Sequence, residues 1–172
     1  MSKLRIWHPS RDAYNCAFRM LRLLQSASNT ELDFERLRIL DLYLLFPALL
    51  HRASMPQAVR DKFKELDVVR PEDMFTQLPS VAALSQDLRV YQNAAISLLL
   101  AKGIVAKEAL RAGVAILYSK HVPKGLRDRL SERDSIDDSV VQFLLDDFAK
   151  IPLTGEGNIY RRIGLPTRAI SQ

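Results

Sequence analysis

Cysteine is nearly absent from this chain of 172 residues, because Cys16 is the only one. A single thiol excludes an internal disulfide framework and is typical of a chain that folds in a reducing compartment. The segment from Met1 to Arg11 has no apolar run of the kind that forms a signal peptide. We therefore expect a cytoplasmic protein.

Long apolar runs are missing as well. The longest, Leu42 to Leu50, is far shorter than the roughly 18 to 20 residues that span a bilayer, and Asp41 and Arg52 flank it closely. The sequence thus predicts no membrane span. With 48% hydrophobic and 26% charged residues, the composition is that of an ordinary globular protein, and the length predicts one compact unit.

Catalytic and metal-binding patterns are also lacking. The histidines His8, His51 and His121 are far apart and have no carboxylate or cysteine at a metal-ligand spacing. No H-E-x-x-H, P-loop or G-x-S-x-G pattern occurs. Adjacent helical residues point about 100° apart, so the carboxylates of Asp146 and Asp147 are poorly placed to share a metal. We expect no enzymatic activity, no cofactor and no metal.

Apolar periodicity predicts a first helix that begins after Ser10, its expected N-cap, and ends in the polar segment from Ser26 to Asn29. One stripe of this helix is apolar and should face the core; it consists of Tyr14, Ala17, Phe18, Leu21 and Leu24.

The second predicted helix, beginning between Leu32 and Phe34, is apolar on nearly every side. From Ile39 to Leu50 its only charged residue is Asp41. Such a helix must be covered on several sides, either at the centre of the domain or in the groove of a partner. Pro47 lacks an amide hydrogen and predicts a kink near Phe46.

Proline marks the start of several further helices. Pro56 and Pro71 predict two short ones, the second with an apolar side made of Met74, Phe75 and Leu78. A longer helix follows Ser80 and stops at Gly103. Another short helix, rich in basic residues, is predicted from Pro123 to Arg133.

The segment from Ile104 to Lys120 is interpreted as two strands that turn at Arg111-Ala112-Gly113. Gly103 stops the preceding helix, and the run from Val114 to Tyr118 favours a strand. A helix is the alternative, because small residues recur at helical spacing at Val105, Ala109, Ala112 and Ala115. A helix followed by a basic hairpin is the outline of a winged helix. The predicted fold class is therefore mainly α with a small β-hairpin, a winged-helix-like helical domain.

We expect this domain to span residues 1–150 and an irregular tail, rich in glycine and proline, to span residues 151–172. The tail is interpreted as a docking arm or as a peptide that lies against its own domain. Its arginines should be exposed and are candidate partner-docking residues: Arg161, Arg162 and Arg168.

Positive charge is concentrated in one window. The chain carries 25 lysines and arginines against 20 acids, and the window from Lys102 to Arg133 holds eight bases against three acids. Such clustering is typical of a surface that binds a phosphate backbone, although a solvated face without a ligand has the same composition. The candidate DNA-binding residues are Lys102, Lys107, Arg111, Lys120, Lys124, Arg127 and Arg129.

The helix from Tyr14 to Leu24, followed by the run Phe34 to Pro47, resembles the middle component of ABC-three-component systems, bacterial defence operons related to the Lamassu type. The resemblance continues from Leu99 to Val105 and is weak after Ile151. It implies a non-catalytic subunit that works beside an ABC or SMC-like ATPase and an effector, often a nuclease, in response to phage or plasmid DNA. The resemblance implies no catalytic residues in this chain.

A winged-helix transcriptional regulator is the alternative function. A recognition helix should present polar donors to base edges, yet Ala94 to Ala101 offers only Ser97, which disfavours a regulator. A standalone enzyme has no sequence feature in its favour.

Overall fold

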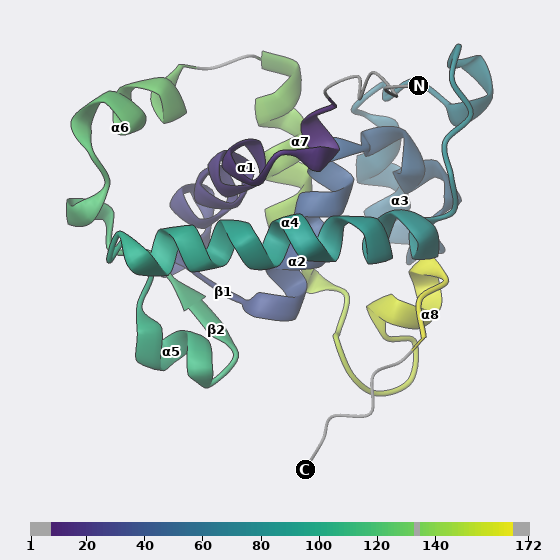
Figure 1. Cartoon of the computed structure of the whole chain (residues 1–172). Coiled ribbons are helices and arrows are strands. Elements are labelled where there is room, and N and C mark those ends of the chain that lie inside the picture. The colour runs from purple at the N-terminus through teal and green to yellow at the C-terminus, as the bar shows by residue number, and fades with distance from the viewer. Residues whose placement is uncertain (1–7, 133–134, 167–172) are drawn as a thin grey trace, which may run out of the picture.

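The computed structural model describes residues 8–132 and 135–166 (Figure 1). This part of the chain is mostly helical and contains one small antiparallel sheet, which confirms the prediction of a mainly α fold with a small β component. The elements are α1 (Ala13–Ser26), β1 (Glu31–Asp33), α2 (Phe34–Leu45), α3 (Gln57–Lys64), α4 (Val81–Ala101), α5 (Lys107–Arg111), β2 (Val114–Ile116), α6 (Lys124–Ser131), α7 (Ser135–Asp146) and α8 (Ile159–Ile163).

One core joins α1, α2, α4 and α7, and α4 crosses the front of the molecule in Figure 1. Helix α2 lies at the centre of the domain, which is one of the two positions expected for a helix that is apolar on nearly every side. Its buried residues are Leu37, Ile39, Leu40, Asp41, Leu42, Tyr43 and Leu44. The chain leaves the α-helical path at Phe46 and continues as a 3-10 helix, Pro47–Arg52, so the predicted kink is confirmed.

The start of α1 differs from the prediction. Its N-cap is Asp12, whose carboxylate accepts hydrogen bonds from the backbone amides of Tyr14 (2.8 Å) and Asn15 (3.2 Å). Ser10 lies in the preceding 3-10 turn. Tyr14 is 74% exposed, so the buried stripe begins one turn later than expected. An ionised acceptor at the cap interacts well with the helix dipole, which favours Asp12 as the start.

The predicted hairpin is wrong in its pairing. Val114–Ile116 is a strand, as expected, but its partner is β1, in the register Glu31 with Ile116 and Asp33 with Val114. Of the segment before the turn, Lys107–Arg111 is helix α5, and Val105 makes only an isolated bridge with Leu117. Lys, Glu, Ala, Leu and Arg are strong helix formers. The left-handed Gly113 (φ 86°) then turns the chain into β2.

The short helix predicted after Pro71 is also absent. The chain makes a single 3-10 turn, Pro71–Asp73, and then an extended loop in which Phe75 is fully exposed. A short helix needs a packed apolar face to be stable in water. Of the face predicted here, only Leu78 packs against the core, while Met74 and Phe75 are exposed.

The described part of the tail lies against its own domain. Ile151, Ile159 and Ile163 are buried in the common core, and α8 ends at the left-handed Gly164. The amide of Ser54 donates to the carbonyl of Arg162 at 2.8 Å. Among the described residues, no helix combines the length and apolarity that a membrane crossing requires.

Candidate functional site

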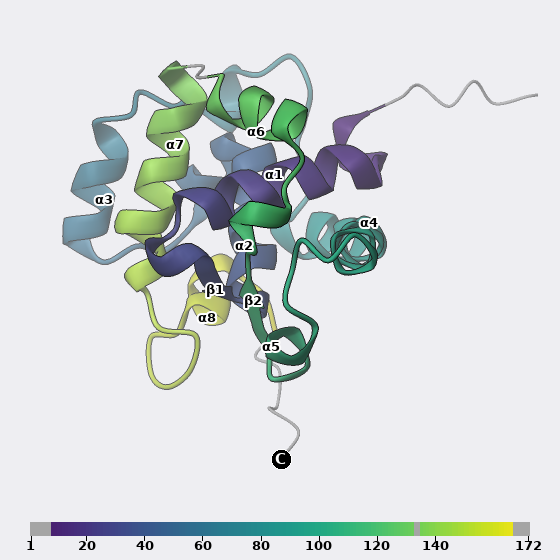
Figure 2. The same cartoon turned by 90° about the vertical axis from the view of Figure 1, so that its left-hand side faces the viewer.

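The seven candidate DNA-binding residues come from four segments that lie on one side of the molecule. These segments are the end of α4, helix α5, the 3-10 turn Ser119–His121 and helix α6. Figure 2 looks at this side, with α4 seen end-on, α5 below and α6 above. All seven side chains are exposed. We call this set the basic face: Lys102, Lys107, Arg111, Lys120, Lys124, Arg127 and Arg129.

Hydrogen bonds hold the first three of these segments, the end of α4, the start of α5 and the 3-10 turn, in place. The ring nitrogen Nδ1 of His121 lies 2.7 Å from the carbonyl oxygen of Gly103, which ties the 3-10 turn to the end of α4. The amide of Tyr118 donates to the carbonyl of Ile104 at 2.8 Å, and that of Ala106 donates to Ile116 at 3.0 Å. The cations of these three segments therefore project from a defined scaffold.

Most of the charge on the basic face is uncompensated. Arg111 pairs with Glu108 at 3.0 Å, and the guanidinium of Arg129 lies 5.7 Å from the centroid of the Phe18 ring. The remaining five residues have neither an acidic partner within 4.0 Å nor an aromatic ring contact among the described residues. Exposed cations without local anions are free to neutralise phosphates. The five are Lys102, Lys107, Lys120, Lys124 and Arg127.

The candidate docking arginines of the tail differ from one another. Arg161 is exposed, as expected. Arg162 is half-buried, contrary to the prediction, and its guanidinium donates to the carbonyls of Gly157 (2.6 Å) and Ser54 (3.2 Å). It therefore fixes the tail to the domain. Arg168 lies outside the described residues.

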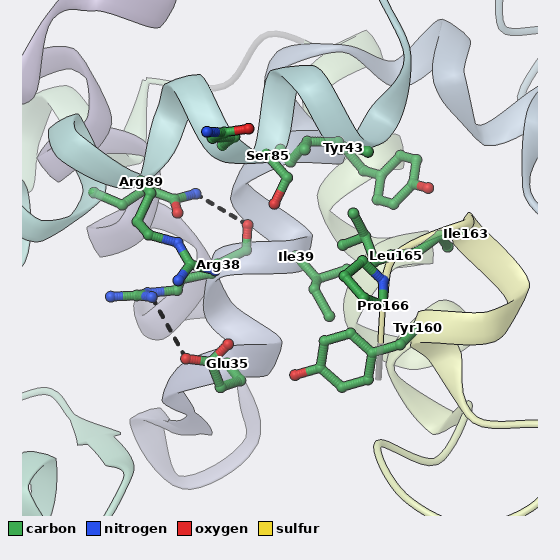
Figure 3. Close-up of a pocket in the computed structure, with 14 residues that line it drawn as sticks. Glu35, Arg38, Ile39, Tyr43, Ser85, Arg89, Tyr160, Ile163, Leu165 and Pro166 are labelled. Atoms are coloured by element: carbon green, nitrogen blue, oxygen red, sulfur yellow. Dashed lines mark hydrogen bonds and ion pairs between the residues drawn. The ribbon is translucent and has the colours of Figure 1, made fainter. Parts of the chain in front are cut away.

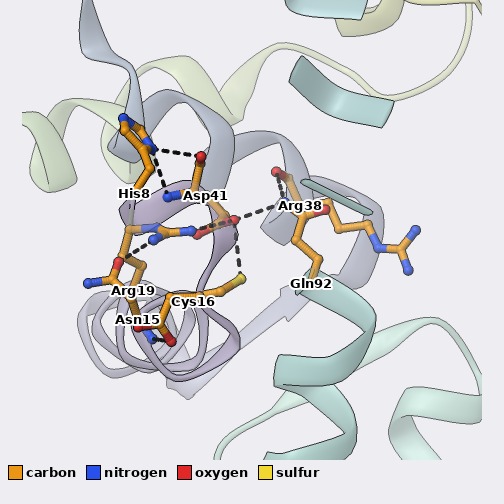
Figure 4. Close-up of polar contacts among 9 residues, drawn as sticks. His8, Asn15, Cys16, Arg19, Arg38, Asp41 and Gln92 are labelled. Atoms are coloured by element: carbon orange, nitrogen blue, oxygen red, sulfur yellow. Dashed lines mark hydrogen bonds and ion pairs between the residues drawn. The ribbon is translucent and has the colours of Figure 1, made fainter. Parts of the chain in front are cut away.

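A buried polar cluster joins α1, α2 and α4 (Figure 4). Asp41 is completely buried and accepts hydrogen bonds from Arg19 Nε at 2.7 Å and from Gln92 Nε2 at 2.9 Å. The thiol of Cys16 lies 3.5 Å from the same carboxylate. Burial, followed by the charge of Asp41, raises the pKa of Cys16 far above its ordinary value. The thiol stays protonated, so it is not a nucleophile at neutral pH.

Sequence reasoning missed this cluster, although one signal was present. A lone carboxylate in an otherwise apolar helix requires a buried partner. The partner, Arg19, lies one turn after Cys16 on the inner side of α1. The cluster joins three helices through a carboxylate that is completely buried, which gives it a structural role.

A cavity of about 480 Å³ lies between α2, α4 and α8 (Figure 3). Arg38 stacks over Phe34 with its guanidinium carbon 4.4 Å from the ring centroid, and it pairs with Glu35 at 3.5 Å. Figure 3 shows the hydroxyl of Tyr160 directed toward Glu35. Burial and the nearby acids Glu35 and Asp33 raise the pKa of Tyr160 to about 12. A neutral phenol beside a paired carboxylate offers neither a nucleophile nor a strong base at neutral pH.

No group of three or more histidine, cysteine or carboxylate side chains in the described ranges is arranged to hold a metal ion. The other prominent chemical feature of the described residues is a surface. This surface, the basic face, is the candidate interface for a polyanion.

One family model matches the chain over residues 5–168; its description is ABC-three component (ABC-3C) system Middle Component 5. The match extends past Ile151, where the resemblance noted in the sequence is weak. Neither the curated proteins nor the solved structures give a significant match.

Proposed function

Because the chain belongs to the Middle Component 5 family of ABC-three-component systems, we propose that it joins the ABC or SMC-like ATPase of its system to the effector. In this proposal the subunit is non-catalytic and cytoplasmic, the effector is of a kind that is often a nuclease, and the system is a Lamassu-like defence against phage or plasmid DNA. The family match over residues 5–168 is the observation that carries the proposal.

The basic face supports a direct contact with DNA as part of this role. Its five uncompensated cations project from the segments between the end of α4 and α6. Neutralising phosphates releases counterions and gives affinity without sequence preference. A subunit that senses foreign DNA for an ATPase needs this kind of contact rather than base recognition. We also propose that the region from α4 to β2 is winged-helix-like.

The test is co-purification. The chain, carrying an affinity tag, is expressed with the products of its neighbouring genes. Recovered proteins are identified by mass spectrometry, and the mass of the assembly is measured by size exclusion with light scattering, with and without duplex DNA. We expect a complex of fixed stoichiometry that contains the ATPase and the effector, whereas the tag alone retains neither.

A different outcome would contradict the proposal. If the chain is recovered alone or as a dimer and binds one particular DNA sequence, it is a transcriptional regulator. Such a dimer would bind two half-sites related by symmetry, which footprinting on the operon's own promoter would reveal.

A further inference from the structure

We propose that the loop over residues 65–79 is a protein-docking element that inserts Phe75 into an apolar pocket, rimmed by basic side chains, on a partner subunit of the same system. We call it the docking loop. The inference rests on the proposed function, because it assumes protein partners, and it names the surface that binds one of them.

The first argument is the exposure of apolar side chains. Six large apolar side chains are exposed among the described residues, and three of them lie on the docking loop: Phe75 (111% exposed), Val69 (60%) and Met74 (39%). Burying one such side chain is worth about 1.5 to 3 kcal/mol. A cluster of unburied apolar side chains on one loop is typical of an interaction site.

The second argument is that the loop is held in place at its base. Two consecutive side chains at the end of the 3-10 helix Pro47–Arg52 fix its two ends. His51 Nε2 lies 2.8 Å from the carbonyl oxygen of Val68, and the guanidinium of Arg52 donates to the carbonyls of Leu78 (3.3 Å) and Pro79 (3.2 Å). A loop fixed in this way loses little conformational entropy when a partner binds.

The third argument is position. In Figure 1 the loop extends from the body at the upper right, whereas α5 and α6 of the basic face lie at the left. In Figure 2, α5 and α6 are nearest the viewer and the loop lies behind the body. A protein bound to the loop would therefore leave the basic face accessible to DNA.

The fourth argument is charge, which also indicates the kind of partner. The docking loop contains one base, Arg70, and four acids, although the whole chain carries a net charge of +5. Phosphates would be repelled by this loop, while a basic protein surface would be attracted to it. Of the acids, Glu65 pairs with Lys62 at 3.5 Å. Glu72 and Asp73 are exposed beside Phe75 and have no basic partner within 4.0 Å in the described part of the chain.

The apolar surface continues into a neighbouring cleft of about 850 Å³ between the docking loop and α4. Thr76 to Pro79 form one side of this cleft, and Val90 (69% exposed) and Tyr91 line the other. An aromatic anchor with further apolar area beside it is the usual arrangement of an interface hot spot. The cleft gives the partner a second place to bury apolar side chains.

The test uses Phe75→Ser in the co-expressed complex, with Tyr118→Ser as the matched control. Tyr118 is also an exposed aromatic residue (47%), but it lies between β2 and α6. Phe75→Ser should unfold at the wild-type temperature because Phe75 is fully exposed, and Tyr118→Ser should stay folded although it loses the ring contact with His121. We expect Phe75→Ser to weaken retention of the ATPase or the effector at least tenfold, and Tyr118→Ser to retain both. Glu72→Lys combined with Asp73→Lys should weaken retention too, most strongly at low salt.

A photo-crosslinking residue at position 75 identifies what the loop contacts. A crosslink to the ATPase or the effector supports the proposal. A crosslink to a second copy of this chain, or undiminished retention by Phe75→Ser from a complex that the wild-type chain does form, overturns it and leaves the proposed function intact. If the wild-type chain retains no partner at all, the proposed function itself fails.

Discussion

Reversing two cations of the basic face tests whether this surface binds DNA. The perturbation is Lys124→Glu with Arg127→Glu, both exposed on α6 and without an acidic partner among the described residues. The matched control is Lys62→Glu with Lys64→Glu on α3, which changes the net charge equally. These lysines are exposed on α3, at the opposite side of the molecule from α5 and α6 (Figure 1), and they pair with Glu65 (3.5 Å) and Asp61 (3.6 Å).

The expected magnitude follows from the number of uncompensated cations. If all five contact phosphates, the logarithm of the affinity should fall with the logarithm of salt concentration with a slope of roughly −4.5, and removing two contacts should reduce the slope to roughly −2.7. Between 50 and 200 mM salt, the wild-type chain should then lose roughly 500-fold in affinity and the α6 variant about 40-fold. The α6 variant should also bind more weakly at every salt concentration in that range.

The assay is fluorescence anisotropy with a short labelled duplex of arbitrary sequence, titrated at several salt concentrations. The control variant should keep the wild-type slope, because its lysines lie away from the basic face. If the α6 variant and the control show the same affinity and the same slope as the wild-type chain, the basic face is ordinary solvated surface. If both variants weaken DNA binding equally, the affinity depends on the net charge of the chain and not on the basic face.

Two further predictions concern the interior. Asp41→Ala should reduce the free energy of unfolding by about 3 to 5 kcal/mol, because it leaves the guanidinium of Arg19 buried without its anion. Urea denaturation measures this, and a loss below about 1 kcal/mol would contradict the structural role of the cluster. The raised pKa of Tyr160, about 12 in the folded chain, favours the protonated phenol in the folded state. The stability this contributes is complete below pH 10, the ordinary tyrosine value, and is lost as the pH rises to about 12. Tyr160→Phe should reduce the fall in stability between pH 10 and about 12. If the variant and the wild-type chain lose stability equally over that range, burial does not raise the pKa of Tyr160.

Local sequence signals account for much of the fold. The kink at Pro47 and the stop at Gly103 were predictable because proline and glycine act on their own backbone, whatever surrounds them. The central position of α2 was predictable because a helix that is apolar on nearly all sides has to be covered. The exposed cations of the basic face were recognisable as a cluster because they are close in the sequence.

Contacts between distant segments were not predictable in the same way. The local sequence correctly predicted a strand at Val114–Ile116. Its partner β1 is more than 80 residues earlier, and a strand of three residues is too short to indicate which segment pairs with it. The isolated Asp41 signalled a need for a partner without indicating Arg19 or Gln92. For the docking loop, the apolar pattern of Met74 and Phe75 suggested a helix, since a sequence alone does not show whether a packing surface is within reach.

The sequence by itself determined the helical class, the charge asymmetry and the family, because each of these depends on residue types and short spacings. The tertiary structure decided which apolar side chains are buried, which strands pair, and which arginines are held by backbone carbonyls and which project into solvent. The physical reason is that burial and pairing depend on what the rest of the chain brings alongside. Phe75 and Phe148 are equally apolar, yet one is fully exposed on a loop and the other is completely buried against Tyr43.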